Sequence, residues 1–376
     1  MRGSIRRRGN CWQIQVYTGA KPDGKPGRYF ESVRSSRKSD AQKRLSELLV
    51  TLEKGVPIPS GRLTLAELLQ TWLEGYVKTN CAPHTQECYK MIAELHLTPA
   101  LGQIQLKQLN AQAIQRYYGK ACAKLSPRTV HKHHRLLSQA LKYAVRQGYL
   151  GRNPCDLVDP PSWRPATMRT LTPSEVVVLM DAVKDNVFYP VIYMALSSGL
   201  RQAELLGLRW RDIDLDMLSI SVSRVLYKRR GVTQFREPKT SYSRRRVAMT
   251  PKLALFLREY RAERESLCWR LGKPPTLDDL VFASPDGRPL DPSQLSHEFT
   301  AMAKRAGLDG CHFHTLRHSF ASLMFLRGAS PKIISAALGH SSVGFTMTVY
   351  AHIISGQEAE AMALLDGVLP AGILRK

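Results

Sequence analysis

Six residues between positions 201 and 350 carry side chains that could together act on a phosphate ester. Arginine guanidiniums are planar, permanently charged and matched to phosphate oxygens. Histidine and lysine can move protons near neutral pH, and tyrosine can act as a nucleophile. In chain order the six are Arg201, Lys239, His314, Arg317, His340 and Tyr350. The sequence has no Gly-rich phosphate loop and no acidic cluster for Mg²⁺, so this chemistry would rely on arginine charge, with neither a metal nor a cofactor.

Arg201 lies in SSGLRQAELLGLRW (197–210), where we expect it to stand at the start of a helix. Leu205, Leu206 and Leu208 indicate the buried side of this segment. Glu204 follows Arg201 by three positions and therefore lies on the same helix face, where its carboxylate could orient the guanidinium. Arg–Glu pairs of this kind are more often structural than catalytic, so Glu204 is interpreted as a supporting residue.

The remaining candidates lie in three further segments. Lys239 falls in REPKTSYSRRRV (236–247), in a turn between two predicted strands from which a lysine can reach outward. His314 and Arg317, in HTLRHSFAS (314–322), are three residues apart, so both point to the same side of a helix and suggest a common anion. His340 and Tyr350 belong to LGHSSVGFTMTVYAH (338–352). Each segment alone is a weak signal, and the anion site is predicted from all four together.

The order Arg…Lys…His-x-x-Arg…His…Tyr resembles that of the tyrosine recombinase (phage integrase) family. The resemblance rests on SGLRQAEL, PKTSYSRRRV, HTLRHSFAS and LGHSSVGFTMTVYAH, and each of the six positions is filled. It implies that Tyr350 attacks a DNA phosphodiester, forming a 3′-phosphotyrosyl bond and releasing a 5′-hydroxyl. It also implies that Arg201 and Arg317 clamp the non-bridging oxygens and stabilise the pentacoordinate state.

The same resemblance assigns the proton transfers. Lys239 would protonate the departing 5′-oxygen, His314 would assist proton transfer at Tyr350, and His340 would hydrogen-bond the phosphate. A free tyrosine has a pKa of about 10, and nearby cations favour its phenolate. Because one phosphate ester replaces another, the strand could be rejoined without ATP.

The charge of the chain points to an anionic partner. Its 376 residues include 55 Lys+Arg against 31 Asp+Glu, a formal net charge of +24, for which nucleic acid is the leading partner. No segment has the length of a membrane span, and MRGSIRRRGN lacks the apolar stretch of a secretory signal. The seven scattered cysteines predict reduced thiols and no zinc site, and HKHH (131–134) is interpreted as a basic helix face. We therefore expect a cytoplasmic, nucleoid-associated bacterial protein.

Residues 1–57 are predicted to form a small basic three-stranded β-sheet with one helix. In NCWQIQVYTG, Trp12, Ile14 and Val16 alternate with polar residues as in a half-buried strand, and RYFESV is interpreted as another strand. Ser39 is expected to cap a helix from about Asp40 to Glu53. Such a sheet can lie in a DNA major groove, although a solvated basic face is an equal alternative. This part resembles the arm-site-binding module of many integrases, and its candidate DNA contacts are Arg6, Arg7, Arg8 and Arg28.

Residues 63–160 are predicted to be helical throughout and are similar to the core-site-binding domain of the family. Ser126 is a candidate N-cap, with Pro127 at the first helical position. An apolar stripe follows at Leu136, Leu137, Ala140, Leu141 and Ala144. Candidate DNA contacts of this helix are Thr129, Lys132 and Arg135.

Residues 165–376 are predicted to form the catalytic domain, joined to the preceding part by a linker near 159–170. Thr172 and Glu175 make a capping-box pattern at a helix start. DMLSISVSRV, GVTQFREP and SRRRVAMT predict one short antiparallel sheet among helices, with Arg244 and Arg245 as candidate phosphate contacts. The fold class is therefore mainly α with small antiparallel β-sheets (α+β). The tail after Tyr350 is expected to dock on a neighbouring protomer.

The resemblance favours an integrase of a phage or mobile element that integrates or excises DNA. Its partners would be double-stranded DNA with core and arm attachment sites, a homotetramer formed on that DNA, and candidate directionality or DNA-bending factors. Two alternatives stay open. A type IB topoisomerase uses similar residues, but the N-terminal module and the two histidines favour a recombinase. A non-catalytic DNA-binding regulator is opposed by the complete set of six residues.

Overall fold

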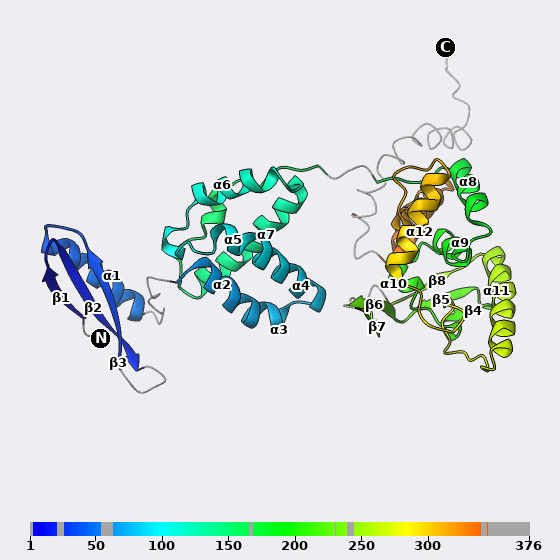
Figure 1. Cartoon of the computed structure of the whole chain (residues 1–376), viewed down its shortest axis with the longest axis horizontal. Coiled ribbons are helices and arrows are strands. Elements are labelled where there is room, and N and C mark those ends of the chain that lie inside the picture. Colours follow the sequence, from blue (N-terminus) through cyan, green and yellow to red (C-terminus); the bar gives the residue numbers. More distant parts are fainter. Residues whose placement is uncertain are drawn as a thin grey trace, which may run out of the picture. The chain divides into compact units, whose positions relative to one another are not determined.

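The computed structural model describes residues 3–20, 26–53, 63–164, 168–229, 231–238, 244–339 and 344. Lys239, His340, Tyr350 and the tail that follows lie outside the described residues. The chain divides into two units, Met1–Pro165 and Ala166–Lys376, and each is described by itself (Figure 1). The structure confirms the predicted fold class, which is mainly helical with small antiparallel sheets. None of the described helices is long and apolar enough to cross a membrane.

The N-terminal part is an antiparallel sheet covered on one side by a helix (Figure 1). Its elements are β1 (Gly3–Arg8), β2 (Cys11–Ala20), β3 (Pro26–Val33) and α1 (Lys38–Glu53). Ile14, Val16 and Tyr29 of the sheet pack with Ala41 and Leu48 of α1.

The sheet has the three strands that were predicted, but the sequence located only two of them. The third, β1, was not placed, because Ile5 is the one apolar residue in GSIRRR, and the segment is a strand through its pairing with β2. One expectation was wrong. The helix begins at Lys38, so Ser39 lies inside it and is not the cap.

The helical part of the first unit spans residues 63–158 around one hydrophobic core. Thr64 caps its first helix in a capping box with Glu67. As predicted, Ser126 caps α7 with Pro127 at its first position. The predicted apolar stripe of α7 is buried. The α-helices are α2 (Leu65–Trp72), α3 (Lys78–Asn80), α4 (Pro83–Ile92), α5 (Thr98–Leu101), α6 (Ala111–Cys122) and α7 (Pro127–Arg146). Short π- and 3₁₀-segments join them, namely η1 (Leu73–Val77), η2 (Ala93–Leu97), η3 (Leu106–Gln108) and η4 (Pro154–Leu157).

The HKHH segment of α7 is not the basic surface that the sequence suggested. His133 is completely buried, its Nδ1 lies 2.8 Å from the Tyr117 hydroxyl, and its ring stacks on His96 with centroids 4.7 Å apart. Burial, reinforced by the charge of His96, lowers the pKa of His133 from its usual 6.5 to about 4. His134 also hydrogen-bonds a tyrosine, Tyr118, at 2.8 Å. Within the described residues no group of three or more His, Cys, Asp or Glu side chains could hold a metal ion.

The buried His133 predicts a pH-dependent stability of the first unit. Between the two pKa values the unfolded chain binds a proton that the folded chain excludes, so stability falls as the pH drops from 6.5 toward 4. We expect this residue to account for a loss of about 2 kcal/mol in the free energy of unfolding between pH 7 and pH 5. Urea denaturation of wild type and His133→Phe at both pH values should show a smaller pH dependence in the variant. The exposed His84→Gln should keep the wild-type pH dependence, and an unchanged slope in His133→Phe would contradict the prediction.

Most helices of the second unit pack around one large core, with β-strands at one end (Figure 1). The last two helices share a smaller apolar cluster of Ala321, Phe325, Ile334 and Leu338. Thr172 caps α8 in a capping box with Glu175, as predicted. The helices are α8 (Pro173–Val183), α9 (Tyr189–Ser198), α10 (Gln202–Leu205), the 3₁₀ turn η5 (Trp210–Asp212), α11 (Pro251–Arg270), α12 (Pro292–Arg305), α13 (Phe313–Leu326) and α14 (Pro331–Leu338).

The strands of the second unit form two sheets where the sequence suggested one. The first sheet has the order β4 (Ile213–Asp214), β5 (Ser219–Val222), β8 (Arg245–Ala248), and the second pairs β6 (Val225–Arg229) with β7 (Val232–Arg236). Chain direction changes between β5 and β6, where Arg224 donates from Nε to the Gly207 carbonyl at 2.8 Å. Among the described strands, β6 pairs with β7, its neighbour in sequence.

Candidate active site

Arg317 reaches from α13 into the interior of the second unit. It is only 3% exposed, and its guanidinium donates to the carbonyls of Gly199 at 2.7 Å and Leu338 at 2.6 Å. Gly199 ends α9 in the left-handed region, with φ of 64°. A Cβ at Gly199 would lie 2.4 Å from the Phe320 ring, so only glycine brings this carbonyl to Arg317 without strain.

Arg201, at the start of α10, shares the Leu338 carbonyl with Arg317. Its guanidinium donates to the Glu204 carboxylate at 2.8 Å and lies 3.5 Å from the carbonyl of Leu338 and 3.4 Å from that of Gly339. The Arg201 side chain is 38% exposed, so it reaches solvent although its partner Glu204 is buried. The structure therefore brings Arg201 and Arg317 together at the carboxyl end of α14, although they are far apart in the sequence.

Glu204 is the buried carboxylate that joins two arginines. It is 2% exposed, and Arg245 donates to both of its oxygens, at 3.1 and 3.0 Å. Burial alone would raise the pKa of Glu204, but the hydrogen bonds and charge of Arg245, together with the backbone N–H and charge of Arg201, lower it below its ordinary value. The expected geometry of Glu204 beside Arg201 is confirmed, and Arg245 is a partner that the sequence did not reveal.

Arg245 is therefore not the surface cation that the sequence suggested, because its guanidinium is committed to Glu204. Its side chain is 8% exposed, and Nε donates to the Ala337 carbonyl of α14 at 2.7 Å. Gly339 makes room for it, because a Cβ there would lie 2.8 Å from the guanidinium. Burial alternates along β8, with Arg245 and Val247 on the inner face. This alternation of a strand could have predicted from the sequence that Arg245 points inward while Arg244 and Arg246 point outward. Arg244, in contrast, is 57% exposed and pairs with Glu237.

His314 lies on α13 one turn before Arg317. Partial removal from water, with the positive charges of Arg317 and Arg201, lowers the pKa of His314 and favours its neutral form. His318 follows one turn later, with its ring edge-on to His314 at a centroid distance of 4.7 Å. Burial, then the charges of His314 and Arg317, lower the pKa of His318 to about 4. The i, i+4 spacing in HTLRH could have shown that His318 belongs to this cluster.

The candidate DNA contacts of the N-terminal sheet are divided between its two faces. The register pairs Arg6 with Gln13, and Gln13 with Ser32, on the face away from α1. Arg8 and Arg28 alternate onto the same open face. Arg7 lies on the opposite face, where its guanidinium is 5.8 Å from the centroid of the Trp12 ring. Trp12 packs against the core under α1, so Arg7 is not aligned with the other three arginines.

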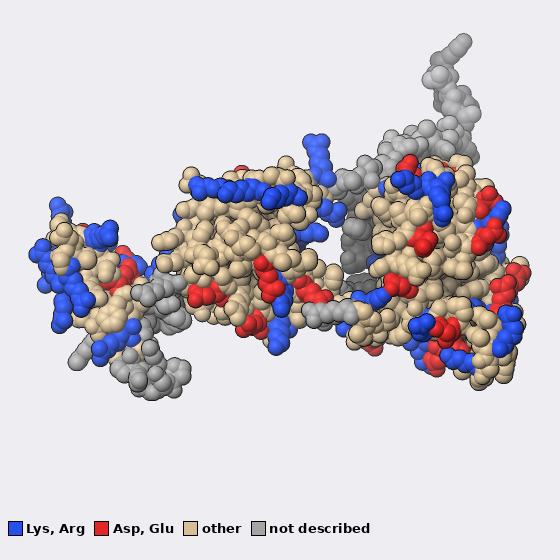
Figure 2. Space-filling model, viewed as in Figure 1, with Lys and Arg blue, Asp and Glu red and all other residues tan. Residues whose placement is uncertain are grey.

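The candidate contacts of α7 lie near its first turns. Lys132 and Arg135 are exposed, while Thr129 is half-buried and lies 2.9 Å from the Ser126 hydroxyl. Figure 2 shows lysine and arginine side chains along one edge of the helical part, and acidic side chains near the opposite edge. Arg116 and Lys120, which are exposed on α6 and were not singled out from the sequence, are further basic residues of this part.

The comparisons with known proteins show the family of the chain. Residues 169–355 match the Phage integrase family, and residues 64–121 match the N-terminal SAM-like domain of phage integrases. The ICEBs1 integrase of Bacillus subtilis (strain 168) is 30% identical over 247 residues, which cover 65% of this chain and 67% of that protein. The chain therefore belongs to the phage integrase family, the tyrosine recombinases, as the sequence predicted.

Two further similarities extend over nearly the whole chain. The Tyrosine recombinase XerC-like protein of Caldanaerobacter subterraneus subsp. tengcongensis is 29% identical over 376 residues, covering 94% of this chain and 95% of that protein. The fold is also similar to that of a lambda integrase, solved as a tetramer bound to a Holliday junction. The TM-score is 0.58 at 18% identity, and the match covers 92% of this chain and 94% of that one.

The position of Glu204 leads to a stability prediction. Glu204→Gln keeps the size of the side chain but removes the negative charge between two guanidiniums, which leaves buried positive charge uncompensated. We expect the free energy of unfolding of the second unit to fall by about 3 kcal/mol, measured by urea denaturation at pH 7. The exposed carboxylate variant Glu263→Gln should change it by less than about 0.5 kcal/mol. Equal values for the two variants would show that Glu204 does not hold the arginines in place.

Proposed function

We propose that this chain cleaves and rejoins DNA at specific sites through a 3′-phosphotyrosyl intermediate, and so integrates or excises a phage or mobile element. The observation that carries the proposal is the convergence of Arg201 and Arg317 at the carboxyl end of α14, in a chain that matches the Phage integrase family over 169–355. Two guanidiniums at one place suit the two non-bridging oxygens of a phosphodiester. The next residue after Gly339 is His340, and Tyr350 follows on the same segment.

In the proposed reaction the phenolic oxygen of Tyr350 attacks phosphorus and forms the new P–O bond. The P–O bond to the 5′-oxygen breaks, and that oxygen takes a proton from Lys239 as it leaves. His314 accepts the Tyr350 proton, and burial with the charges of Arg317 and Arg201 lowers its pKa and favours the neutral form that can accept it. Arg201 and Arg317 stabilise the charge of the pentacoordinate state, and His340 hydrogen-bonds the phosphate. Attack by a 5′-hydroxyl reverses these steps and rejoins the strand.

The proposed division of labour assigns 1–57 to arm sites, 63–160 to core sites and 165–376 to catalysis. On α7 the exposed residues Lys132 and Arg135, with Thr129 beside them, would contact phosphates, and so would Arg244 of the second unit. The open face of the N-terminal sheet would enter a major groove. By analogy with the lambda integrase tetramer, we propose that four copies assemble on DNA, with the tail after Tyr350 docking on a neighbour. A directionality or DNA-bending factor would be a further partner.

The first test is covalent capture. A nicked suicide DNA with the core site should give a denaturant-stable adduct with wild type and none with Tyr350→Phe, because phenylalanine lacks the attacking oxygen. Gel electrophoresis under denaturing conditions measures the adduct. An adduct that persists in Tyr350→Phe would contradict the choice of nucleophile. Exchange of strands between two labelled duplexes, which relaxation by a topoisomerase does not produce, then separates the recombinase from the main alternative.

The two faces of the N-terminal sheet predict unequal effects of two arginine substitutions. Arg28→Ala removes a cation from the open face and should weaken binding to arm-site DNA about tenfold, while leaving adduct formation on core DNA unchanged. Arg7→Ala, on the face with Trp12, is the matched control and should bind within about twofold of wild type. Binding is measured by electrophoretic mobility shift at fixed salt. Equal losses in the two variants would show that neither face is specific for DNA.

A further inference from the structure

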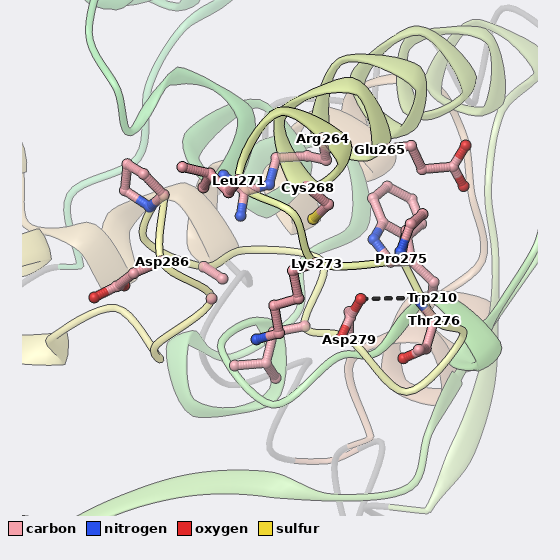
Figure 3. Close-up of a pocket in the computed structure, with 14 residues that line it drawn as sticks. Trp210, Arg264, Glu265, Cys268, Leu271, Lys273, Pro275, Thr276, Asp279 and Asp286 are labelled. Atoms are coloured by element: carbon pink, nitrogen blue, oxygen red, sulfur yellow. Dashed lines mark hydrogen bonds between the residues drawn. The ribbon is translucent and has the colours of Figure 1, made fainter.

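A cavity of about 260 Å³ lies in the second unit, between the end of α11 and the chain that follows it. Arg264 and Cys268 approach it from α11, and Lys273 and Asp279 from the segment below (Figure 3). Arg201, Glu204, Arg245, His314 and Arg317 do not line it. The pocket is therefore distinct from the described part of the proposed active site, and the proposed function does not use it.

The walls of this pocket are mostly apolar, and a backbone hydrogen bond and a cation–π contact fix Trp210 at one side of it. Leu280, Ala283 and Pro275 line it beside Trp210, which is 5% exposed. The backbone N–H of Trp210 donates to the Asp279 carbonyl at 3.1 Å, and Arg261 covers the indole ring at 5.6 Å. A preformed apolar pocket with a few converging polar groups is the usual form of a small-molecule site.

The acidic residues of the pocket already have partners. Asp279 accepts the backbone N–H of Thr276 at 2.8 Å, and Glu265 accepts from Arg261 at 2.7 Å. Asp286 accepts from Ser284 and Arg288 at the rim. Arginines therefore offset the charges of Glu265 and Asp286, and the backbone N–H of Thr276 satisfies one oxygen of Asp279.

The two cations of the lining have no such compensation. Arg264 donates to the neutral carbonyl of Ser284 at 3.0 Å, and neither Arg264 nor Lys273 forms an ion pair with a carboxylate of the described residues. Two positive groups beside an apolar wall favour a ligand with one anionic end. The volume is slightly below the range of about 300–1,000 Å³ for drug-sized ligands, so the ligand must be small.

We propose that this pocket binds a small organic anion, with its apolar body beside Trp210 and its carboxylate or phosphate held by Lys273 and Arg264. Such a ligand would join the end of α11 to the segment 271–287. It would give the protein a binding site for a small metabolite, distinct from its site for DNA.

The probes are 4-phenylbutyrate, phenyl phosphate and the neutral amide of 4-phenylbutyrate, added to the full-length protein without DNA. The local readout is the rate at which iodoacetamide alkylates Cys268, identified by mass spectrometry of its peptide. An anion in the pocket should slow this alkylation in a saturable way, and the neutral amide should bind about tenfold more weakly. A stronger effect of the phosphate than of the carboxylate would identify the preferred anionic group. Equal protection by the anions and the amide would overturn the proposal.

Three variants test whether the protection of Cys268 arises from an anion bound in this pocket. Lys273→Ala should weaken anion binding about tenfold by removing one charged hydrogen bond, and Ala283→Trp should abolish it by filling the space. Arg270→Ala, on an exposed cation of the same helix outside the lining, is the matched control and should bind as wild type does. Unchanged binding in Lys273→Ala would exclude this pocket even if Ala283→Trp does not fold. Protection of Cys268 by duplex DNA, with loss of anion binding, would assign the two cations to the DNA-binding surface and overturn the proposal.

Discussion

The second unit depends on one buried carboxylate. Glu204 lies between Arg201 and Arg245, and without it these like charges would repel each other where little water can screen them. The carbonyls at the end of α14 add partial negative charge, because the last carbonyls of a helix have no partner within it and the helix dipole is negative there. Arg245, Arg317 and Arg201 lie at these carbonyls in turn, at Ala337, Leu338 and Gly339. The contacts that hold the end of α14 in place are therefore the same contacts that balance the charge of the three arginines.

This arrangement explains how interior contacts can prepare a site for a phosphate. Arg317 and Arg245 are almost completely buried, whereas Arg201 reaches solvent. Cations held rigidly in a region of low dielectric interact strongly with an arriving anion, because little reorganisation is needed. The same cations favour the neutral form of His314, which must accept a proton in the proposed reaction. One cluster thus serves charge stabilisation and proton transfer together.

Much of this structure could be predicted where the signal is local in the sequence. The caps at Ser126 and Thr172 depend on side chains close to the backbone they bind, and the six candidate site positions follow a family order. Features decided by tertiary packing were either not located, as with the third strand of the N-terminal sheet, or misjudged, as with His133. Strand β1 exists through its pairing with β2, and His133 is buried although its neighbours in HKHH suggested a solvated face. The Leu338 carbonyl that joins Arg201 and Arg317 could not be foreseen, since a backbone acceptor has no residue-type signal.

Gly339, at the end of α14, also sets a limit on where the proposed nucleophile can be. Arg201 and Arg317 hold the backbone just before His340, so this point of the chain is an anchor. Tyr350 follows Gly339 by 11 residues, and a chain of that length spans at most about 40 Å even when fully extended. The tyrosine is thus tethered to the arginines, and its effective concentration beside them is set by covalent connection and not by diffusion. The same length exceeds the width of a DNA duplex, so the tether alone allows Tyr350 to serve its own arginines or those of an adjacent copy.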